Sequence, residues 1–245
     1  MRYKLTIEYD GTNYLGWQSQ ENGKTVQEAI EQAIFKFSGE KVNLCCAGRT
    51  DAGVHACGQV AHFDLPSDKF DAYTVRNALN FYLKKEDVVV LNAEVVGEDF
   101  HARFTAKKRY YKFVILNRHM QPVLEKNRVW WVGPHLDEQK MNDAAKLLLG
   151  KHDFSTFRAA ECQAKSPVKT LDEAYFVREG EHIYFYTSAT SFLHHQVRNM
   201  VGALKLVGEG KWSIADFKKA FDACDRTKGG PNASPSGLYF MRVEY

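Results

Sequence analysis

The chain has 245 residues, of which 44% are hydrophobic and 26% are charged, so it has enough apolar residues to bury a core and fold. Its 33 Lys and Arg residues against 30 Asp and Glu residues give a formal net charge of +3. This balance excludes a histone-like basic chain and leaves local basic patches open. Five cysteines without a Cys-x-x-Cys pair argue against a disulfide framework and a structural zinc site. With no membrane-length apolar run and no signal-peptide pattern, we expect a soluble cytoplasmic protein.

The first half of the chain is predicted to contain four strands and two helices. Residues 2–9 alternate polar and apolar side chains, which is typical of a half-buried strand. Thr25 and Glu28 have the spacing of a capping box, and the helix they begin is expected to end before Gly39. The remaining elements are expected near 41–47, 58–65, 73–84 and 88–96. Together they have the order βαββαβ.

The second half is predicted to repeat that order. The elements are a strand at 109–117, a helix from Asp137 to Gly150, a hairpin of 173–178 and 182–188, helices at 191–207 and 213–223, and a strand at 238–245. We therefore predict an α+β protein of two ferredoxin-like βαββαβ domains, residues 1–104 and 105–245, with antiparallel sheets and helices on one face. The loop 225–237, rich in Gly, Pro, Asn and Ser, is expected to be the most mobile segment.

The most unusual stretch is 48–56, Gly-Arg-Thr-Asp-Ala-Gly-Val-His-Ala, which is longer than a hairpin turn requires. Gly48 and Gly53 flank a carboxylate and permit positive φ angles. Arg49 and Asp51 are two residues apart, so in an extended segment both side chains point the same way. Taken alone, the pattern fits an Asx-type turn with a surface ion pair as well as it fits a reactive carboxylate.

The second stretch, 100–112, has five Lys or Arg residues between 103 and 112, no acid among them, and interleaved aromatic residues. Cations that bind phosphates and rings that stack on bases are what single-stranded or looped RNA requires. A solvated charge run entering a strand explains the same pattern equally well.

The third stretch is 192–202. On a helix, His194 and Arg198 share a face at i, i+4, next to an apolar stripe. An arginine at the edge of such a stripe needs a partner, which we expect to be a carboxylate from elsewhere in the chain. The adjacent His194 and His195 point apart on a helix, so a metal site has less support than a surface pair.

The fourth stretch, 10–18, places Tyr14, Trp17 and several amide and hydroxyl groups on a glycine-containing loop. It fits a ligand contact or a loop whose tryptophan covers the edge of the core. The chain lacks a Walker loop, a dinucleotide-binding glycine motif, a Gly-x-Ser-x-Gly elbow and a His-Glu-x-x-His motif. Readings as an ATPase, a dinucleotide-binding enzyme, a serine hydrolase or a zinc protease therefore have no support.

These four stretches, in this order, resemble the TruA family of tRNA pseudouridine synthases from the first predicted strand to the last. Segment 48–56 matches the catalytic signature of that family without a substitution, and 192–202 is a second strong match. Two places depart from the family patterns. Arg-Tyr-x-Tyr reads Arg-Tyr-Tyr-Lys at 109–112, and the C-terminal Gly-Leu-x-Leu ends in Phe240.

The resemblance implies roles for individual residues and places the active-site cleft between the two domains. Asp51 would be the catalytic aspartate, Arg198 its ion-pair partner, and Tyr110 the ring that stacks on the target base. Arg49 would fill the space of the flipped nucleotide, and Leu238 would line the pocket wall. The further expected substrate contacts are His55, Arg103, Lys107 and Arg109.

By resemblance, the chain isomerises uridine to pseudouridine at positions 38, 39 and 40 in the anticodon stem-loop of tRNA. The resemblance also implies a homodimer and a reaction that uses no cofactor and no metal. Three alternatives stay open: a catalytically silent RNA-binding protein, a paralogous synthase with other RNA targets, and a metal-dependent hydrolase using His55, His194 and His195. The hydrolase has the least support.

Overall fold

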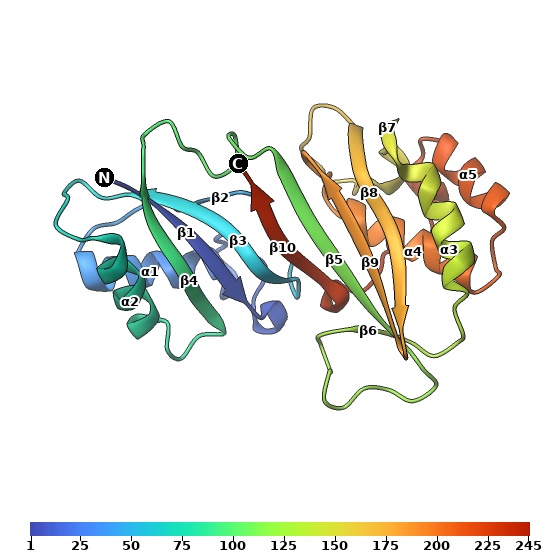
Figure 1. Cartoon of the computed structure of the whole chain (residues 1–245), viewed down its shortest axis with the longest axis horizontal. Coiled ribbons are helices and arrows are strands. Elements are labelled where there is room, and N and C mark those ends of the chain that lie inside the picture. The colour runs from blue at the N-terminus through green and yellow to red at the C-terminus, as the bar shows by residue number, and fades with distance from the viewer. The chain divides into compact units, whose positions relative to one another are not determined.

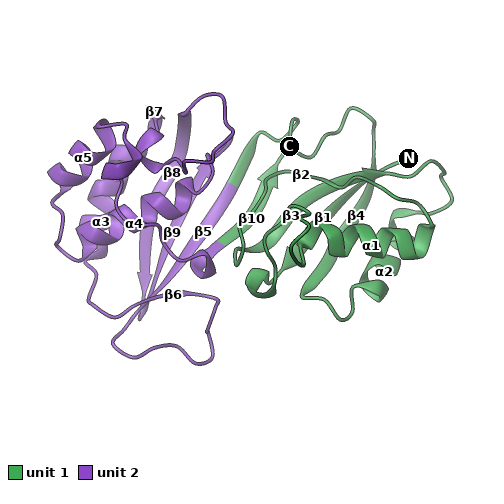
Figure 2. Ribbon diagram, turned by 180° about the vertical axis from the view of Figure 1, so that it is seen from behind, with its two compact units in different colours: residues 1–109, 239–245 green, residues 110–238 purple.

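The computed structural model describes residues 1–245 and divides into two compact units (Figure 2). Unit 1 comprises residues 1–109 and 239–245, and unit 2 comprises residues 110–238. Most of the last strand thus belongs to unit 1, whereas the sequence placed all of it in the second predicted domain. The reason is pairing in parallel with a unit 1 strand, with Tyr239 opposite His55. None of the helices has both the length and the apolar character needed to cross a membrane.

The elements of unit 1 follow the predicted βαββαβ order (Figure 1). They are β1 (Arg2–Tyr9), α1 (Val26–Ser38), β2 (Cys45–Cys46), β3 (His55–Asp64), α2 (Ala72–Tyr82), β4 (Val88–Val96) and, from the end of the chain, most of β10 (Leu238–Glu244). β1 lies between β4 and β3 and is antiparallel to both, and β2 pairs antiparallel with β3. α1 and α2 contact each other and cover one face of this sheet (Figures 1 and 2).

The predicted alternation in residues 2–9 is confirmed, because Tyr3, Leu5, Ile7 and Tyr9 are all buried while the side chains between them are more exposed. The predicted capping box before α1 is half formed. The Thr25 hydroxyl accepts a hydrogen bond from the Glu28 N–H at 3.3 Å, but the Glu28 carboxylate accepts from Gln32 instead of reaching back. The predicted strand at 41–47 shrinks to two paired residues.

Unit 2 places a second set of helices against strands of its own. Its elements are β5 (Lys108–Asn117, of which Lys108 and Arg109 lie in unit 1), β6 (Trp130–Val132), α3 (Glu138–Ala145), β7 (Gly150–Asp153), β8 (Val168–Glu179), β9 (His182–Ala189), α4 (Gln196–Gly208) and α5 (Ile214–Asp222). The strand order is β5-β9-β8-β7, with β8 antiparallel to both of its neighbours. The molecule therefore mixes helices with mostly antiparallel strands, as predicted.

Within unit 2, the predicted hairpin of β8 and β9 is confirmed, with Gly180 in the left-handed conformation at its turn. The predicted helix 137–150 is shorter, because α3 ends at Ala145 and a 3-10 turn follows. β6 and β7 were not predicted, since strands of three and four residues are too short to show a period. α4 is the central helix, and its Met200, Val201 and Leu204 are fully buried.

Candidate active site

The loop between β2 and β3 carries Arg49, which is exposed, and Asp51, which is half-buried. It closes with a turn in which the Asp51 carbonyl accepts a hydrogen bond from the Val54 N–H at 3.2 Å, and Gly53 has a φ of 76°. An L side chain at Gly53 would be strained in this conformation, which explains the glycine. The loop is therefore an ordered turn with a carboxylate at its start.

Buried groups of unit 1 hold this loop on both sides of Arg49. The Gln59 side-chain amide donates to the Gly48 carbonyl at 2.6 Å, and the Tyr9 hydroxyl lies 2.7 Å from the Thr50 hydroxyl. The backbone N–H of Trp17 donates to the Thr50 carbonyl at 3.0 Å. Sequence reasoning assigned no role to Tyr9, Gln59 or Thr50. The one available signal was that Tyr9 falls on the buried face of β1, directly before Asp-Gly.

His55 lies inside the fold instead of facing solvent. It is 2% exposed, and its ring stacks on Tyr239 with centroids 4.8 Å apart. Its Nδ1 accepts a hydrogen bond from the Gly11 N–H at 3.0 Å, although the Asp10 carboxylate lies 3.1 Å from the same atom. Because an amide can only donate, we assign the accepting role to Nδ1. In this structure His55 holds the Asp10-Gly11 turn. Its expected contact with the substrate stays a prediction.

The basic segment divides into exposed and buried arginines. Arg103 and Lys107 are exposed, as is Phe104, whose ring lies under the Arg103 guanidinium at 5.9 Å. Arg109 is only 7% exposed and donates to the carbonyls of Ala47 at 2.9 Å and Arg103 at 2.6 Å. The expected RNA contact of Arg109 stays a prediction. Its guanidinium ties the Arg103 turn to the residue before the Asp51 loop.

In unit 2, α4 starts at Gln196, five residues later than predicted. His195 is in the left-handed conformation with a φ of 61°, and the Gln196 side chain accepts from the Leu193 N–H at 2.8 Å. His194 thus precedes the helix, and the predicted i, i+4 pair of His194 with Arg198 does not form on a helix face. Apolar spacing suggested a helix there because Leu193 continues the stripe.

Arg198 lies in the first turn of α4 and is tied to the loop 225–237. Its Nε donates to the Ala233 carbonyl at 2.9 Å, and the Ala233 N–H donates to the Arg198 carbonyl at 3.1 Å. Asn199 accepts from Arg226 at 3.0 Å and donates to the Phe157 carbonyl at 2.9 Å. The polar residues of the motif therefore anchor the loop that the sequence suggested would be mobile.

Tyr110 and Leu238 also belong to unit 2. Tyr110 is half-buried near the start of β5, and Tyr111 packs edge-on against Phe192 with centroids 5.0 Å apart. Leu238 is buried at the start of β10. Asp51 and Arg49 lie in unit 1, so the predicted Asp51–Arg198 ion pair stays a prediction.

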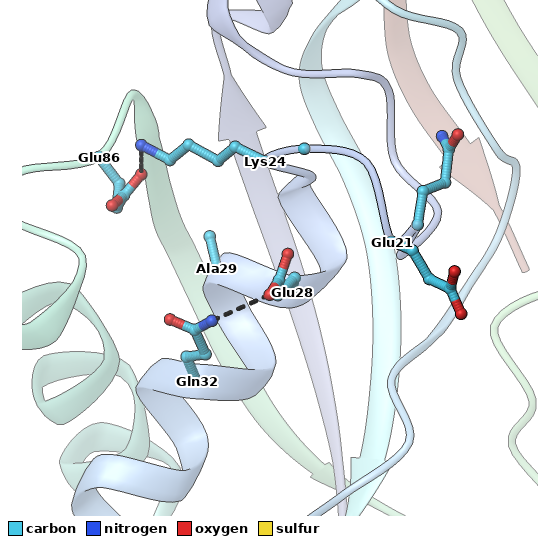
Figure 3. A pocket seen from close by; sticks show the side chains of 8 residues that line it. Glu21, Lys24, Glu28, Ala29, Gln32 and Glu86 are labelled. Carbon is cyan, nitrogen blue, oxygen red and sulfur yellow. Dashed lines mark hydrogen bonds and ion pairs between the residues drawn. The ribbon is translucent and has the colours of Figure 1, made fainter.

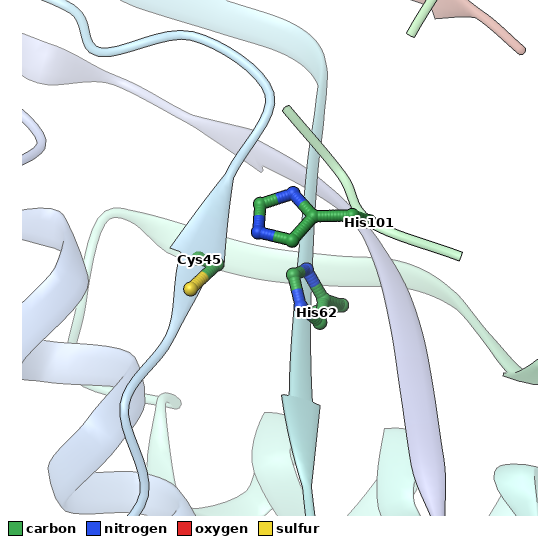
Figure 4. A group of neighbouring side chains, drawn as sticks. All are labelled: Cys45, His62 and His101. Carbon is green, nitrogen blue, oxygen red and sulfur yellow. The ribbon is translucent and has the colours of Figure 1, made fainter. Parts of the chain in front are cut away.

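A cysteine and two histidines of unit 1 lie close together (Figure 4). One candidate ligand atom from each of Cys45, His62 and His101 lies within 4.8 Å of the others. However, Nδ1 of His62 accepts from the Ala102 N–H at 3.2 Å, and Nδ1 of His101 accepts from the Arg103 N–H at 3.1 Å. A neutral imidazole that accepts at Nδ1 carries its proton on Nε2, which leaves no lone pair for a metal. Burial lowers the pKa of His62, which keeps this ring neutral. The donor set fits a structural tie better than a metal centre.

A hollow of about 350 Å³ lies beside the start of α1 (Figure 3). Its charged lining consists of Glu21, Glu28, Glu86 and Lys24, and Lys24 is ion-paired with Glu86. An acidic lining repels phosphate, so this hollow is unsuited to the RNA backbone. A second hollow of about 430 Å³ lies in unit 2 and includes His194, His195, Arg226 and Asn232 in its lining. The Glu161 carboxylate also lines it, so its charged side chains have both signs.

Comparisons with known proteins decide the family. A family model described as tRNA pseudouridine synthase matches residues 5–105 and 144–245. The chain belongs to the tRNA pseudouridine synthase family. It is 53% identical to tRNA pseudouridine synthase A of Rhodospirillum rubrum, over 100% of this chain and 88% of that protein. The protein of the same name from Paramagnetospirillum magneticum is 57% identical, over 100% and 95% of the two chains. That of Wolbachia pipientis wMel is 51% identical, over 100% of both.

The matched ranges of this synthase family contain Asp51 and Arg198, whereas Tyr110 lies between them. Among solved structures, a chain of the crystal structure of a Cbf5-Nop10-Gar1 complex is similar with a TM-score of 0.44 and 11% sequence identity. That match covers 98% of this chain and 49% of the other. At this score it adds nothing to the assignment. Family membership thus rests on the sequence matches over the whole chain.

Proposed function

We propose that this chain isomerises uridine to pseudouridine in tRNA, with Asp51 as the catalytic carboxylate. The observation that carries the proposal is the Asp51 loop itself. It reproduces the signature of the synthase family, and buried hydrogen bonds from Tyr9 and Gln59 hold it in place. A reactive group needs such a fixed backbone, because small displacements from the productive geometry are costly in rate.

The reaction breaks the bond between N1 of the base and C1′ of the ribose, forms a bond from C5 to C1′, and moves a proton from C5 to solvent while N1 gains one. Asp51 serves this exchange as a carboxylate, by adding to the sugar or the base or by removing a proton. Each of these roles requires its ionised form. Arg198 is proposed as the cation that favours this form, since a nearby guanidinium stabilises a carboxylate.

The remaining residues are proposed to hold the RNA. Tyr110 stacks on the target base and Arg49 occupies the space that the flipped nucleotide leaves. A uridine in a stem leaves the stack at a cost of a few kcal/mol, which such contacts offset. Leu238 is proposed to line the wall beside the base. Exposed Arg103 and Lys107, with the exposed Phe104 ring between them, support phosphate and base contacts at this turn.

The target within tRNA is proposed to be the anticodon stem-loop, at positions 38, 39 and 40. We further propose that the enzyme acts as a homodimer in the cytoplasm. Each of the two units is proposed to be ferredoxin-like. In unit 1, the position of β1 between β4 and β3, with β2 on β3, supports this assignment.

Tritium release tests the proposed function directly. tRNA labelled at uridine C5 is incubated with the wild-type chain, with and without a chelator, and the sites of pseudouridine are then mapped. We expect equal release in both arms and product at positions 38 to 40. Binding of tRNA without release would favour the silent RNA-binding protein, whereas release from other positions would favour a paralogous synthase. Loss of activity with chelator would support metal-dependent chemistry.

The basic turn gives a prediction about salt. Each lysine or arginine bound to a phosphate releases counterions, so the logarithm of the tRNA association constant falls as log salt rises. Arg103→Gln or Lys107→Gln is expected to make this negative slope less steep by about 0.7 to 0.9. The measurement is tRNA affinity at several salt concentrations. Lys69→Gln removes an exposed charge outside this turn and serves as the control. Equal slopes for the wild type and the Arg103 and Lys107 variants would show that these two residues do not bind RNA phosphates.

A further inference from the structure

Two buried tyrosines lie on the inner face of β1 and differ in what their hydroxyls contact. Tyr3 is 0% exposed and donates its hydroxyl to the Phe70 carbonyl at 2.5 Å. Tyr9 is 3% exposed, and its hydroxyl lies 2.7 Å from the Thr50 hydroxyl. The two residues share a strand, a face and nearly the same burial. They form a natural pair for separating what a buried tyrosine hydroxyl does for folding from what it does for the loop.

Thr50 is the residue between Arg49 and Asp51. It is 8% exposed, its hydroxyl meets Tyr9, and its carbonyl accepts from the Trp17 N–H at 3.0 Å. Its side chain and its backbone are therefore both fixed from within the fold. Since peptide groups are planar, fixing Thr50 restricts the direction in which the following residue, Asp51, leaves the turn.

The hydrogen bond between the Tyr9 and Thr50 hydroxyls does not depend on pH near neutrality. Burial raises the pKa of Tyr9 above its ordinary value, so the hydroxyl stays protonated. A buried hydroxyl without a partner costs free energy, so the two hydroxyls keep each other in place. Tyr9 also packs against Trp17, with ring centroids 6.0 Å apart, which limits movement of the ring.

We propose that Tyr9 is a positioning residue for the isomerisation: through the Thr50 hydroxyl it fixes the backbone that carries Asp51. This inference rests on the proposed function of Asp51. It assigns the Tyr9 hydroxyl a contribution to turnover and none to tRNA binding, because the group is buried and contacts Thr50 instead of solvent.

The test compares Tyr9→Phe with Tyr3→Phe, each of which removes one buried hydroxyl from β1. Tyr9→Phe is expected to lower kcat by about 10- to 100-fold, the scale expected when a catalytic group is misplaced by up to about 1 Å. KM for tRNA is expected to stay within about twofold, because no RNA contact is removed. Tyr3→Phe is expected to keep kcat near the wild-type value. Thermal unfolding of both variants is measured alongside, to show that each is folded.

Thr50 tests the same hydrogen bond from its other side. Thr50→Val keeps the shape and removes the hydroxyl, so it is expected to lower kcat as Tyr9→Phe does. The double variant is expected to lose no more than the worse single variant, because both changes break one contact. Thr50→Ser restores the hydroxyl and is expected to recover kcat relative to Thr50→Val.

Several results would overturn the inference. They are a fall in kcat for Tyr9→Phe no larger than for Tyr3→Phe, a change confined to KM, and additive losses in the double variant. The wild-type chain in the same tritium-release assay separates this failure from failure of the proposed function. An inactive wild type overturns the function, whereas an active wild type with an equally active Tyr9→Phe overturns only the role of Tyr9.

Discussion

Asp51→Asn is expected to abolish pseudouridine formation while leaving the protein folded and able to bind tRNA. Asparagine has nearly the same shape but no negative charge, so it neither adds to the substrate as a carboxylate does nor accepts the proton. We expect a loss of about 10³-fold or more in kcat, as for removal of a nucleophile or general base. Tritium release measures the reaction, and a filter or gel-shift assay measures tRNA binding.

Asp68→Asn is the matched control, because Asp68 is an exposed carboxylate of the same unit outside the candidate site. It removes the same charge from the protein and is expected to leave turnover unchanged. Turnover of Asp51→Asn near the wild-type rate would remove Asp51 from the chemistry. Loss of tRNA binding together with activity would instead assign Asp51 to binding.

Gly202→Ala is expected to destabilise unit 2 despite the higher helix propensity of alanine. Gly202 lies in α4 with the Pro231 carbonyl oxygen so close that an added Cβ would overlap it. The neighbour is backbone, so the loop itself has to shift. We expect the free energy of unfolding to fall by about 2 kcal/mol or more, since overpacking outweighs the roughly 1 kcal/mol that alanine gains in a helix. Urea unfolding measures the change.

The same helix supplies the control. An added Cβ at Gly208 would meet the sulfur of Met141 at 2.6 Å, which is part of a flexible side chain that can move away. Gly208→Ala is therefore expected to change the free energy of unfolding by about 1 kcal/mol or less. Equal effects of the two substitutions would contradict the argument that backbone contact at Gly202 sets the cost. Gly202→Ala is also expected to lower activity, because Ala233 of the displaced loop binds Arg198.

The elements with a clear period were predictable from the sequence. The alternation in β1 and the hairpin of β8 and β9 depend on local side-chain patterns, and the structure has both. The start of α4 was not predictable from the apolar stripe, because Leu193 continues the stripe while the left-handed backbone of His195 ends the helix before it. Whether residues 191–195 join the helix or form a turn before it depends on contacts with distant segments, such as that of the Ala159 N–H with the His194 carbonyl.

The exposure of individual side chains in the basic segment 100–112 was also not predictable from the sequence. Arg103 and Arg109 look alike in the sequence, yet the first is exposed and the second is buried against backbone carbonyls of its own unit. Exposure depends on which segments pack over a side chain, and composition carries no such information. The burial of His55 was likewise not predictable from the sequence, and its ring stacks on Tyr239 inside the fold.

The sequence by itself determined the family and the candidate catalytic residues, because a run of specific residues such as 48–56 is written directly in the chain. Only the tertiary structure decided which groups hold that run in place. Tyr9 lies 41 residues before Thr50 in the chain, and Tyr9 and Gln59 both reach the loop because β1 and β3 pair antiparallel. Hydrogen bonds between such distant residues arise from strand pairing and burial, which no local pattern specifies.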